Sequence, residues 1–598
     1  MRLSLLLIAF LALTPPLRAQ DDRISRVLFS TAQLGNLLFP KDPRTVQIVV
    51  EARRTLPPGA RTIDCDVRDY WGAEQTEPVQ LKLADGESKP GRVLYTGTLD
   101  LAGATLEIGR YYEIHVAVPA EKGEPFRAQT SFAILPAAEA KKYKPEEIPF
   151  TSRSWDNRLL EHVRLTDRLG LRLCGLSGTW AARAPYAAQV PQLDLVKQLG
   201  LGWLTVTPVA EMEAGKAVYD ETALRQGVRN LITQFGAVRP MVLNLGNDPR
   251  GTGDRVLKNV AAYRAVYEAA KKTDPAITVV ATAVEPNEEY FKAGYGQWCD
   301  AFDFHDYDKT PDTVRRTIGE YRALMKKYQC EKPIWCTELG FNSQGRTRLA
   351  AAAALTKKFT VFFAAGGARA GWFGLLSPDP EGKTSGSATD ALNVFDGRYN
   401  RYAPRLDAIA YFNAVNAIAI KKFVEEKAYA NGVHAFLFRD PDARSLQVLW
   451  SDQGRQEIGL PLAGVQEVQV IRIDGSLHKL QADNTDLSLS VSDEPLLLLY
   501  QGGGALPAKL DVSFVTLEPL PKTLSRNESS ALTIFTRSFP LEGVDLIVPP
   551  SWKWESKGLQ FNVTPPAGTA AREADFTLTL TDAKGLRRGE LYAHAPLE

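Results

Sequence analysis

Two carboxylic acids stand at the ends of short apolar runs, where a buried strand would deliver them to its carboxyl end. Glu338 closes such a run in residues 333–340, PIWCTELG, and a glycine follows two residues later. Asp248 has a similar place in residues 243–249, LNLGNDP. Two carboxyl groups on two strand ends are the minimum set for cleaving a glycosidic bond. The pattern therefore indicates acid and nucleophile chemistry on a sugar.

The elements that must position these acids alternate between strand and helix from residue 150 to 421. Eight apolar runs are separated by stretches that are mostly helical in pattern, and the runs are continuous, as in strands buried on both faces. This count predicts a central (β/α)8 TIM barrel. The expected strands are 150–155, 171–175, 203–207, 241–245, 278–283, 301–305, 333–336 and 370–373.

In such a barrel the chemistry belongs to the residues that follow the strands. The rim that the sequence predicts is rich in acids and carries aromatic residues, which suits a neutral polyhydroxylated ligand. Its candidate residues, in chain order, are Glu211, Glu213, Asn247, Asp248, Glu285, His305, Asp306, Tyr307, Glu338 and Trp372.

The barrel resembles a clan A glycoside hydrolase and is most similar to the xylosidase/iduronidase-like families. Those families place Asn-Glu-Pro after strand four, His-x-Tyr after strand six, Thr-Glu-Leu-Gly or similar after strand seven and Trp at strand eight. The resemblance covers about residues 150–420. The matching motifs in this sequence are Asn247-Asp248-Pro249, His305-Asp306-Tyr307, Thr337-Glu338-Leu339-Gly340 and the single residue Trp372.

The resemblance implies a retaining mechanism. Glu338 would attack the anomeric carbon and Asp248 would protonate the leaving oxygen. Asn247 would hold a sugar hydroxyl. His305 and Tyr307 would orient the nucleophile, and Trp372 would stack under the sugar ring.

The sequence departs from the family pattern at two places. Asp248 replaces the usual glutamate, which shortens the acid by about 1–1.5 Å. Relatives tend to have an arginine on strand two that faces the nucleophile, whereas Arg172 points to the other side of a regular strand. Asp248 is alternatively a turn residue or a helix cap, and Glu285 is a substitute acid or a loop residue.

The segments outside the barrel are rich in short strands, with Gly and Pro between them. They predict β-sandwich domains on both sides of the barrel. The expected division of the chain is a signal peptide at 1–19, a sandwich at 24–136, a linker at 137–149, the barrel at 150–421, a sandwich packed on it at 422–501 and a C-terminal sandwich at 508–598.

The first residues have the pattern of a secretory signal, with Arg2, an apolar core and Ala19 at a cleavage position. They predict a secreted or periplasmic protein without a membrane span once the signal is cleaved. The net charge is +1, from 71 basic and 70 acidic residues, so nucleic acid is a poor partner. Five cysteines and six histidines show no metal-ligand spacing, and no metal or cofactor is expected.

Three functions remain open from the sequence. The first is an exported glycoside hydrolase that acts on a polysaccharide or oligosaccharide. The second is a carbohydrate-binding relative with weakened or lost activity because Asp248 is short. The third is a surface scaffold in which the barrel is only a platform.

Overall fold

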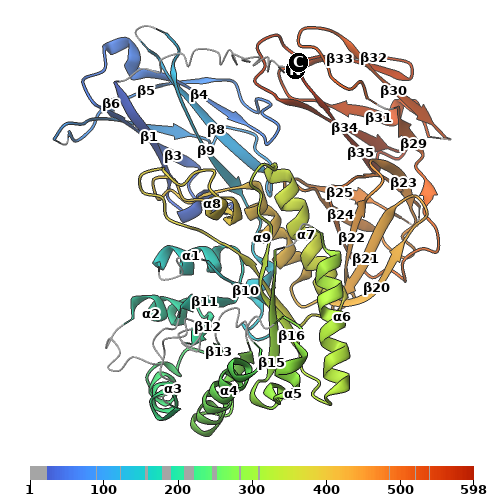
Figure 1. The fold of residues 1–598 in the computed structure, drawn as a ribbon. Helices are drawn as coiled ribbons and strands as arrows, with labels where there is room; N and C mark the ends of the chain where they lie inside the picture. The colour runs from blue at the N-terminus through green and yellow to red at the C-terminus, as the bar shows by residue number, and fades with distance from the viewer. Residues whose placement is uncertain are drawn as a thin grey trace, which may run out of the picture.

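A computed structural model gives the fold. It describes residues 23–598 apart from 89, 121–122, 155–158, 178–189, 208–220, 246–251, 282–284, 308–309, 484, 519 and 538. The predicted signal peptide at 1–19 lies outside the described residues. Figure 1 shows the barrel, coloured cyan to yellow, below two β-rich regions, one blue and N-terminal and the other orange to red and C-terminal.

Eight parallel strands form a closed barrel in which β10 pairs with β17. The predicted TIM barrel is therefore confirmed, and each predicted strand has its counterpart. The strands are β10 Phe150–Ser152, β11 Leu173–Ser177, β12 Gly202–Thr207, β13 Met241–Leu245, β14 Thr278–Ala281, β15 Ala301–Asp306, β16 Ile334–Gly340 and β17 Arg369–Phe373.

Amphipathic or wholly buried helices cover the barrel, as their apolar spacing requires. Between the strands and the helices lies a large apolar core. A smaller apolar cluster fills the barrel interior and includes Trp335 of β16. The helices are α1 Leu160–Arg168, α2 Pro191–Gln198, α3 Glu221–Phe235, α4 Asp254–Thr273, α5 Glu288–Lys292, α6 Asp312–Lys327, α7 Arg348–Ala364, α8 Ala388–Leu392 and α9 Leu406–Ile418.

Two sheets precede the barrel and enclose their own apolar core. Their strands alternate buried and exposed side chains, the pattern of a sheet with one face on a core. The first sheet contains β1 Ile24–Thr31, β3 Thr45–Ala52, β7 Val93–Asp100 and β6 Ala84–Asp85. The second contains β2 Leu37–Leu38, β9 Phe126–Ile134, β8 Tyr111–Val118, β4 Thr62–Arg68 and β5 Val79–Lys82.

Three more sheets follow the barrel. The first contains β20 Lys422–Ala428, β21 Val433–Arg439, β22 Arg444–Ser451, β27 Leu496–Gln501, β24 Glu467–Ile471 and β25 Leu477–Gln481. The second contains β28 Asp511–Val512, β23 Gln456–Leu460, β26 Leu487–Val491, β35 Arg587–Pro596, β34 Glu573–Thr581 and β31 Val544–Ile547. The third contains β29 Val515–Leu517, β30 Ser530–Thr536, β33 Gln560–Thr564 and β32 Lys553–Lys557.

The second of these sheets joins the segments 422–501 and 508–598. In it β26 pairs in parallel with β35, through Ser488 with Gly589 and Leu489 with Glu590. The two segments therefore share one continuous sheet. The domain limits given by the sequence stay predictions.

All five cysteines are free thiols, and Cys330 and Cys336 form no disulfide. Among the described residues, no helix combines the length and apolar character needed to cross a membrane.

Candidate active site

Strand β16 contains a β-bulge next to Glu338, the predicted nucleophile. Asp303 of β15 lies opposite Trp335, but His305 lies opposite Glu338, so β16 has one extra residue over this stretch. The register against β17 shifts over the same stretch. In a regular strand the side chains of Thr337 and Glu338 would point to opposite faces of the sheet. The bulge lets both side chains contact residues of β15, Thr337 with Asp303 and Glu338 with His305. The bulge therefore aims the carboxylate of Glu338 into the barrel.

Three side chains contact the carboxylate of Glu338, which is only 6% exposed. Arg153 places its Nη2 atom 2.6 Å from Oε1. On the other oxygen, the hydroxyl of Tyr307 donates a hydrogen bond of 2.5 Å to Oε2. The Nδ1 atom of His305 lies 3.2 Å from the same oxygen. Both oxygens are thus held, and the orientation of the carboxylate is fixed.

Arg153 is the residue in contact with Glu338 that the sequence did not predict. It follows β10 directly, because this strand ends at Ser152 and not at residue 155 as predicted. A survey of the residues after each strand finds it once that end is known. Arg172, the arginine next to strand two, lies elsewhere and donates a hydrogen bond of 2.9 Å to the carbonyl of Gly200. The expectation that Arg172 points away from the nucleophile is confirmed.

A buried aspartate stabilises the bulge from inside the barrel. Asp303 is 0% exposed and accepts hydrogen bonds of 2.7 Å from both the backbone N–H and the hydroxyl of Thr337. Asn244 of β13 donates a longer one of 3.3 Å to Asp303. Burial raises the pKa of Asp303, while His305 and the two bonds from Thr337 oppose that shift. This aspartate therefore positions Thr337, and through it the bulge beside Glu338.

The ring of Tyr307 is held by close packing, although the residue is 38% exposed. Its edge meets the ring of Phe373 with centroids 5.9 Å apart. A Cβ atom at Gly340 would lie 2.5 Å from the Tyr307 ring, so only glycine leaves room for it. The hydroxyl that reaches Glu338 thus depends on neighbours from β16 and β17.

Lys358 ties helix α7 to the ends of two strands from behind the site. Its fully buried Nζ atom donates to Oδ1 of Asp306 at 2.5 Å and to the backbone carbonyls of Asp306 at 3.0 Å and of Gly340 at 2.9 Å. Because Asp306 precedes Tyr307 and Gly340 packs on its ring, this lysine fixes the backbone on both sides of Tyr307.

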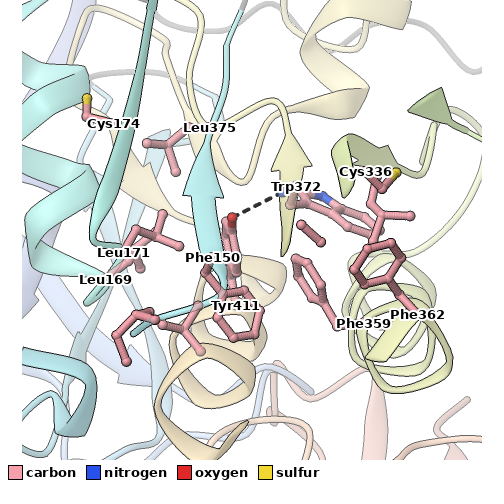
Figure 2. Packing of buried hydrophobic residues seen from close by; sticks show 14 of the residues in the cluster. Phe150, Leu169, Leu171, Cys174, Cys336, Phe359, Phe362, Trp372, Leu375 and Tyr411 are labelled. Atoms are coloured by element: carbon pink, nitrogen blue, oxygen red, sulfur yellow. Dashed lines mark hydrogen bonds between the residues drawn. The ribbon is translucent and has the colours of Figure 1, made fainter. Parts of the chain in front are cut away.

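Trp372 lies in the core between the barrel and its helices, and the structure does not bring it together with Glu338. It is 1% exposed, and its ring packs 6.0 Å from that of Phe359. Figure 2 shows it beside Phe359 and Tyr411, whose hydroxyl accepts a hydrogen bond from the backbone N–H of Trp372. The aromatic residue that contacts the site is the next one, Phe373.

The candidate acid lies in a part of the rim that the structure does not describe. Asn247 and Asp248 fall in 246–251, and the lower-ranked Glu211 and Glu213 fall in 208–220. Glu285 is described and is exposed on the rim. Of the predicted site residues, the structure therefore brings together Glu338, His305 and Tyr307. In the described ranges, no group of three or more His, Cys, Asp or Glu residues is arranged to hold a metal ion.

Comparison with solved structures places this geometry in a known fold. A family 39 glycoside hydrolase from Bacteroides cellulosilyticus WH2 superposes on this chain with a TM-score of 0.57 at 16% sequence identity. The superposition covers 78% of this chain and 100% of that one. The chain shares its fold with that glycoside hydrolase. The predicted barrel with flanking β-sheet domains is thus confirmed as a fold.

Other solved structures are more distant. A glucosidase from Croceicoccus marinus has a TM-score of 0.44 at 14% identity, over 58% of this chain and 95% of that one. β-Glucuronidase 2 from Bacteroides uniformis has a TM-score of 0.36 at 13% identity, over 96% and 77%. No protein-family model matches the sequence, and no curated protein matches it.

Proposed function

We propose that this protein is an exported glycoside hydrolase that cleaves O-glycosidic bonds of a polysaccharide or oligosaccharide, with Glu338 as the nucleophile. One observation carries this proposal. Arg153, His305 and Tyr307 converge on the two oxygens of a buried carboxylate at the carboxyl end of a barrel strand. That face of a (β/α)8 barrel is where such folds place their chemistry. The fold shared with a glycoside hydrolase supports the assignment.

The contacts of Glu338 suit a nucleophile. The guanidinium of Arg153 balances the negative charge of the carboxylate, and both side chains are buried. The hydrogen bond from Tyr307 and the contact with His305 leave Oε2 in one orientation, which reduces the entropy lost when that oxygen approaches an anomeric carbon. These three residues are positioning residues for Glu338.

The chemistry that follows is a double displacement. An oxygen of Glu338 bonds to the anomeric carbon while the bond from that carbon to the glycosidic oxygen breaks, and Asp248 gives its proton to the leaving oxygen. Water then attacks the same carbon, Asp248 takes its proton and Glu338 leaves. The sugar contact by Asn247 and the proton transfer by Asp248 stay predictions from the sequence, whereas Trp372 is buried in the core and takes no part in this mechanism.

Kinetics on a panel of 4-nitrophenyl glycosides tests the proposal. Glu338→Gln should lower kcat/KM at least roughly a thousandfold, because it removes the nucleophile and keeps the shape of the side chain. Glu331→Gln is the matched control, since Glu331 is exposed at the opposite end of β16. Equal activity of wild type and Glu338→Gln would refute a catalytic role for Glu338.

A second candidate function is sugar binding without turnover, and the aspartate at position 248 favours it. Retaining enzymes hold their two carboxyl groups about 5–5.5 Å apart and inverting enzymes about 6.5–9.5 Å apart. An aspartate is shorter than a glutamate by about 1–1.5 Å, which would put the distance between the carboxyl groups of Asp248 and Glu338 near the gap between these ranges. Calorimetry with oligosaccharides, together with an assay for reducing ends, decides between the two functions. Binding without release of reducing ends supports this alternative, and release that is lost in Asp248→Asn supports hydrolysis.

A further inference from the structure

A cavity of about 300 Å³ lies where the barrel meets the sheets on both sides of it. Its walls come from Tyr70 and Tyr111 of the N-terminal sandwich, the start of α7, the segment after β17 and the C-terminal segment. Two lining residues are carboxylates, Glu113 and Asp396. Five are arginines: Arg348, Arg398, Arg401, Arg405 and Arg572. We call this space the arginine cavity.

Two of the five arginines have structural roles. Arg348 lies 3.3 Å from a carboxylate oxygen of Asp407 and also donates to the carbonyl of Ala391. Arg405 lies 2.6 Å from the carboxylate of Asp390 and donates to two backbone carbonyls. Their charges are compensated and their donors are largely used, so they fix the segment after β17 and do not point to a ligand.

The other three arginines have more positive charge than their partners balance. Arg398 and Arg401 share a single carboxylate, that of Asp396, at 2.5 Å each. Arg572 donates to the backbone carbonyl of Tyr70 and forms no ion pair within the described part of the chain. Among the described residues these three guanidinium groups have one paired carboxylate between them, that of Asp396, since the other lining carboxylate, Glu113, lies 2.9 Å from His115.

A buried donor of Arg401 has no acceptor. Its side chain is 7% exposed, yet its Nε atom has no hydrogen-bond partner in the described ranges. Leaving a buried charged donor unsatisfied is costly, so the guanidinium of Arg401 is less fully satisfied than those of Arg348 and Arg405.

A second hollow of about 430 Å³ continues the arginine cavity and shares Gln129, Arg398 and Arg401 with it. It adds Arg127, which is exposed and has no ion pair among the described residues. The first turn of α7 also borders the arginine cavity through Thr347, and the amino end of a helix favours negative charge. Asp64 and Asp66 also line the second hollow, but arginines outnumber carboxylates in both walls.

We propose that the arginine cavity is a binding site for the oxyanion of a ligand, a carboxylate, sulfate or phosphate group. The planar guanidinium fork matches the oxygens of these groups and binds them through paired, charge-assisted hydrogen bonds. The volume is at the lower end of ligand pockets, which suits one such group with a short stem. The site is separate from Glu338 and requires no hydrolysis.

Calorimetry on the full chain tests this site, at constant ionic strength set with chloride. The probes are inorganic phosphate, inorganic sulfate, a sulfated oligosaccharide, a uronate oligosaccharide and a neutral oligosaccharide. Wild type should bind at least one anionic probe with one-to-one stoichiometry. A probe that binds only as an oligosaccharide assigns a glycan-borne oxyanion, and binding of the inorganic ions assigns a free one.

The variant Arg398→Gln/Arg572→Gln should weaken that binding at least tenfold, since each lost charge-assisted bond is worth about that factor. Arg572→Gln alone tests the same point in a protein with one exposed change. Arg53→Gln is the matched control, because Arg53 is an exposed arginine outside both hollows. Failure of wild type to bind any anionic probe, or unchanged binding by the variants, would overturn the assignment.

Discussion

At the residue scale, the hydroxyl of Tyr307 tests the proposed role of Glu338. Its removal takes away one contact of the carboxylate and changes little else in the site. Tyr307→Phe removes the 2.5 Å hydrogen bond to Glu338 and keeps the ring on Phe373. A hydrogen bond to a charged group is worth about 1.5–3 kcal/mol, so we expect kcat to fall roughly 10- to 100-fold with KM little changed. Steady-state kinetics on an aryl glycoside gives the answer.

The control for that change is Tyr328→Phe. Tyr328 also donates its hydroxyl to a carboxylate, that of Glu288, but it does so on the outer face of the barrel. Its loss should leave kcat within a few-fold of wild type. Equal losses in the two variants would show that the effect of Tyr307 is a general loss of stability.

Arg153 is proposed to position Glu338, and chemical rescue separates this role from a purely structural one. Arg153→Ala leaves Glu338 without its cationic partner, and removing one partner of a buried pair costs about 3–5 kcal/mol. We expect kcat to fall at least roughly 100-fold and to recover in part when guanidinium ions are added at millimolar concentration.

Arg172→Gln serves as the control for Arg153, because Arg172 pairs with Asp167 and the carbonyl of Gly200 away from the site. Its activity should not respond to guanidinium. An Arg153→Ala variant that keeps full activity would contradict the role given to this arginine.

The residues around Glu338 show what the sequence could and could not predict. His305 and Tyr307 could be predicted because they lie at the end of a clear apolar strand, β15. Arg153 was missed because the first strand is only Phe150–Ser152, and sequence patterns fix strand ends to within a few residues. Trp372 and Phe373 are adjacent aromatic residues, and only the register of β17 decides which one faces Tyr307.

At the element scale, Gly340 of the bulged strand β16 packs against the ring of Tyr307, which follows the neighbouring strand β15. An added methyl group there would lie 2.5 Å from the ring of Tyr307, which is closer than real contacts allow. Gly340→Ala should therefore displace Tyr307 and lower kcat by about as much as Tyr307→Phe does. The double variant should lose little more than either single change, since both act through one hydroxyl.

The matched control is Gly319→Ala on helix α6, where an added Cβ meets nothing within 4 Å. In a helix interior this change is neutral or stabilising by up to about 1 kcal/mol. Circular dichroism and thermal melting should show both variants folded. Wild-type activity in Gly340→Ala would mean that the ring of Tyr307 is not held as described.

The bulge itself could not be predicted from the sequence. Residues 333–340 read as a strand that ends before Glu338, because an apolar run followed by a carboxylate and a glycine looks like a strand end. In the structure the strand continues to Gly340. The extra residue depends on Asp303, which bonds both the backbone and the hydroxyl of Thr337 from a different strand.

At the scale of the whole molecule, a histidine joins the sheets on both sides of the barrel. His478 of β25 lies 2.9 Å from Glu590 of β35 and 3.7 Å from Glu107, which precedes β8. Burial alone lowers the pKa of His478, but the two carboxylates outweigh it and raise the pKa to about 9. The protonated ring thus connects three parts of the chain.

This histidine predicts a pH dependence of stability. Its folded pKa is above the value of about 6.5 in an unfolded chain, so its contribution is complete below pH 6.5 and is lost as the pH rises through about 9. The contribution is on the order of 2 kcal/mol at neutral pH. The difference in thermal midpoint between wild type and His478→Gln should be largest near pH 6 and should disappear above pH 9.

His434→Gln is the control, since His434 pairs with an exposed carboxylate of one sheet only, that of Asp452. Its thermal midpoint should follow that of wild type over the same range of pH. A difference for His478→Gln that is constant from pH 6 to 10 would mean that the ring is not a charged link.

The strand and helix count of the barrel could be predicted because each of its strands is a continuous apolar run between recognisable turns. The C-terminal arrangement could not. One sheet takes β23 and β26 from residues 422–501 and β34 and β35 from residues 508–598, and such long-range pairing leaves no local signal. The same holds for the arginine cavity, whose wall residues are separated by hundreds of positions.

The central claim is that Glu338 is the nucleophile, and covalent labelling tests it most directly. The protein would be treated with the 2-deoxy-2-fluoroglycosyl fluoride of the sugar that the aryl glycoside panel identifies, then digested and analysed by mass spectrometry. The mechanism predicts one label per chain on the peptide that contains Glu338, equal labelling of Glu331→Gln and none of Glu338→Gln. A label on another carboxylate such as Glu285, or no label at all, would contradict it.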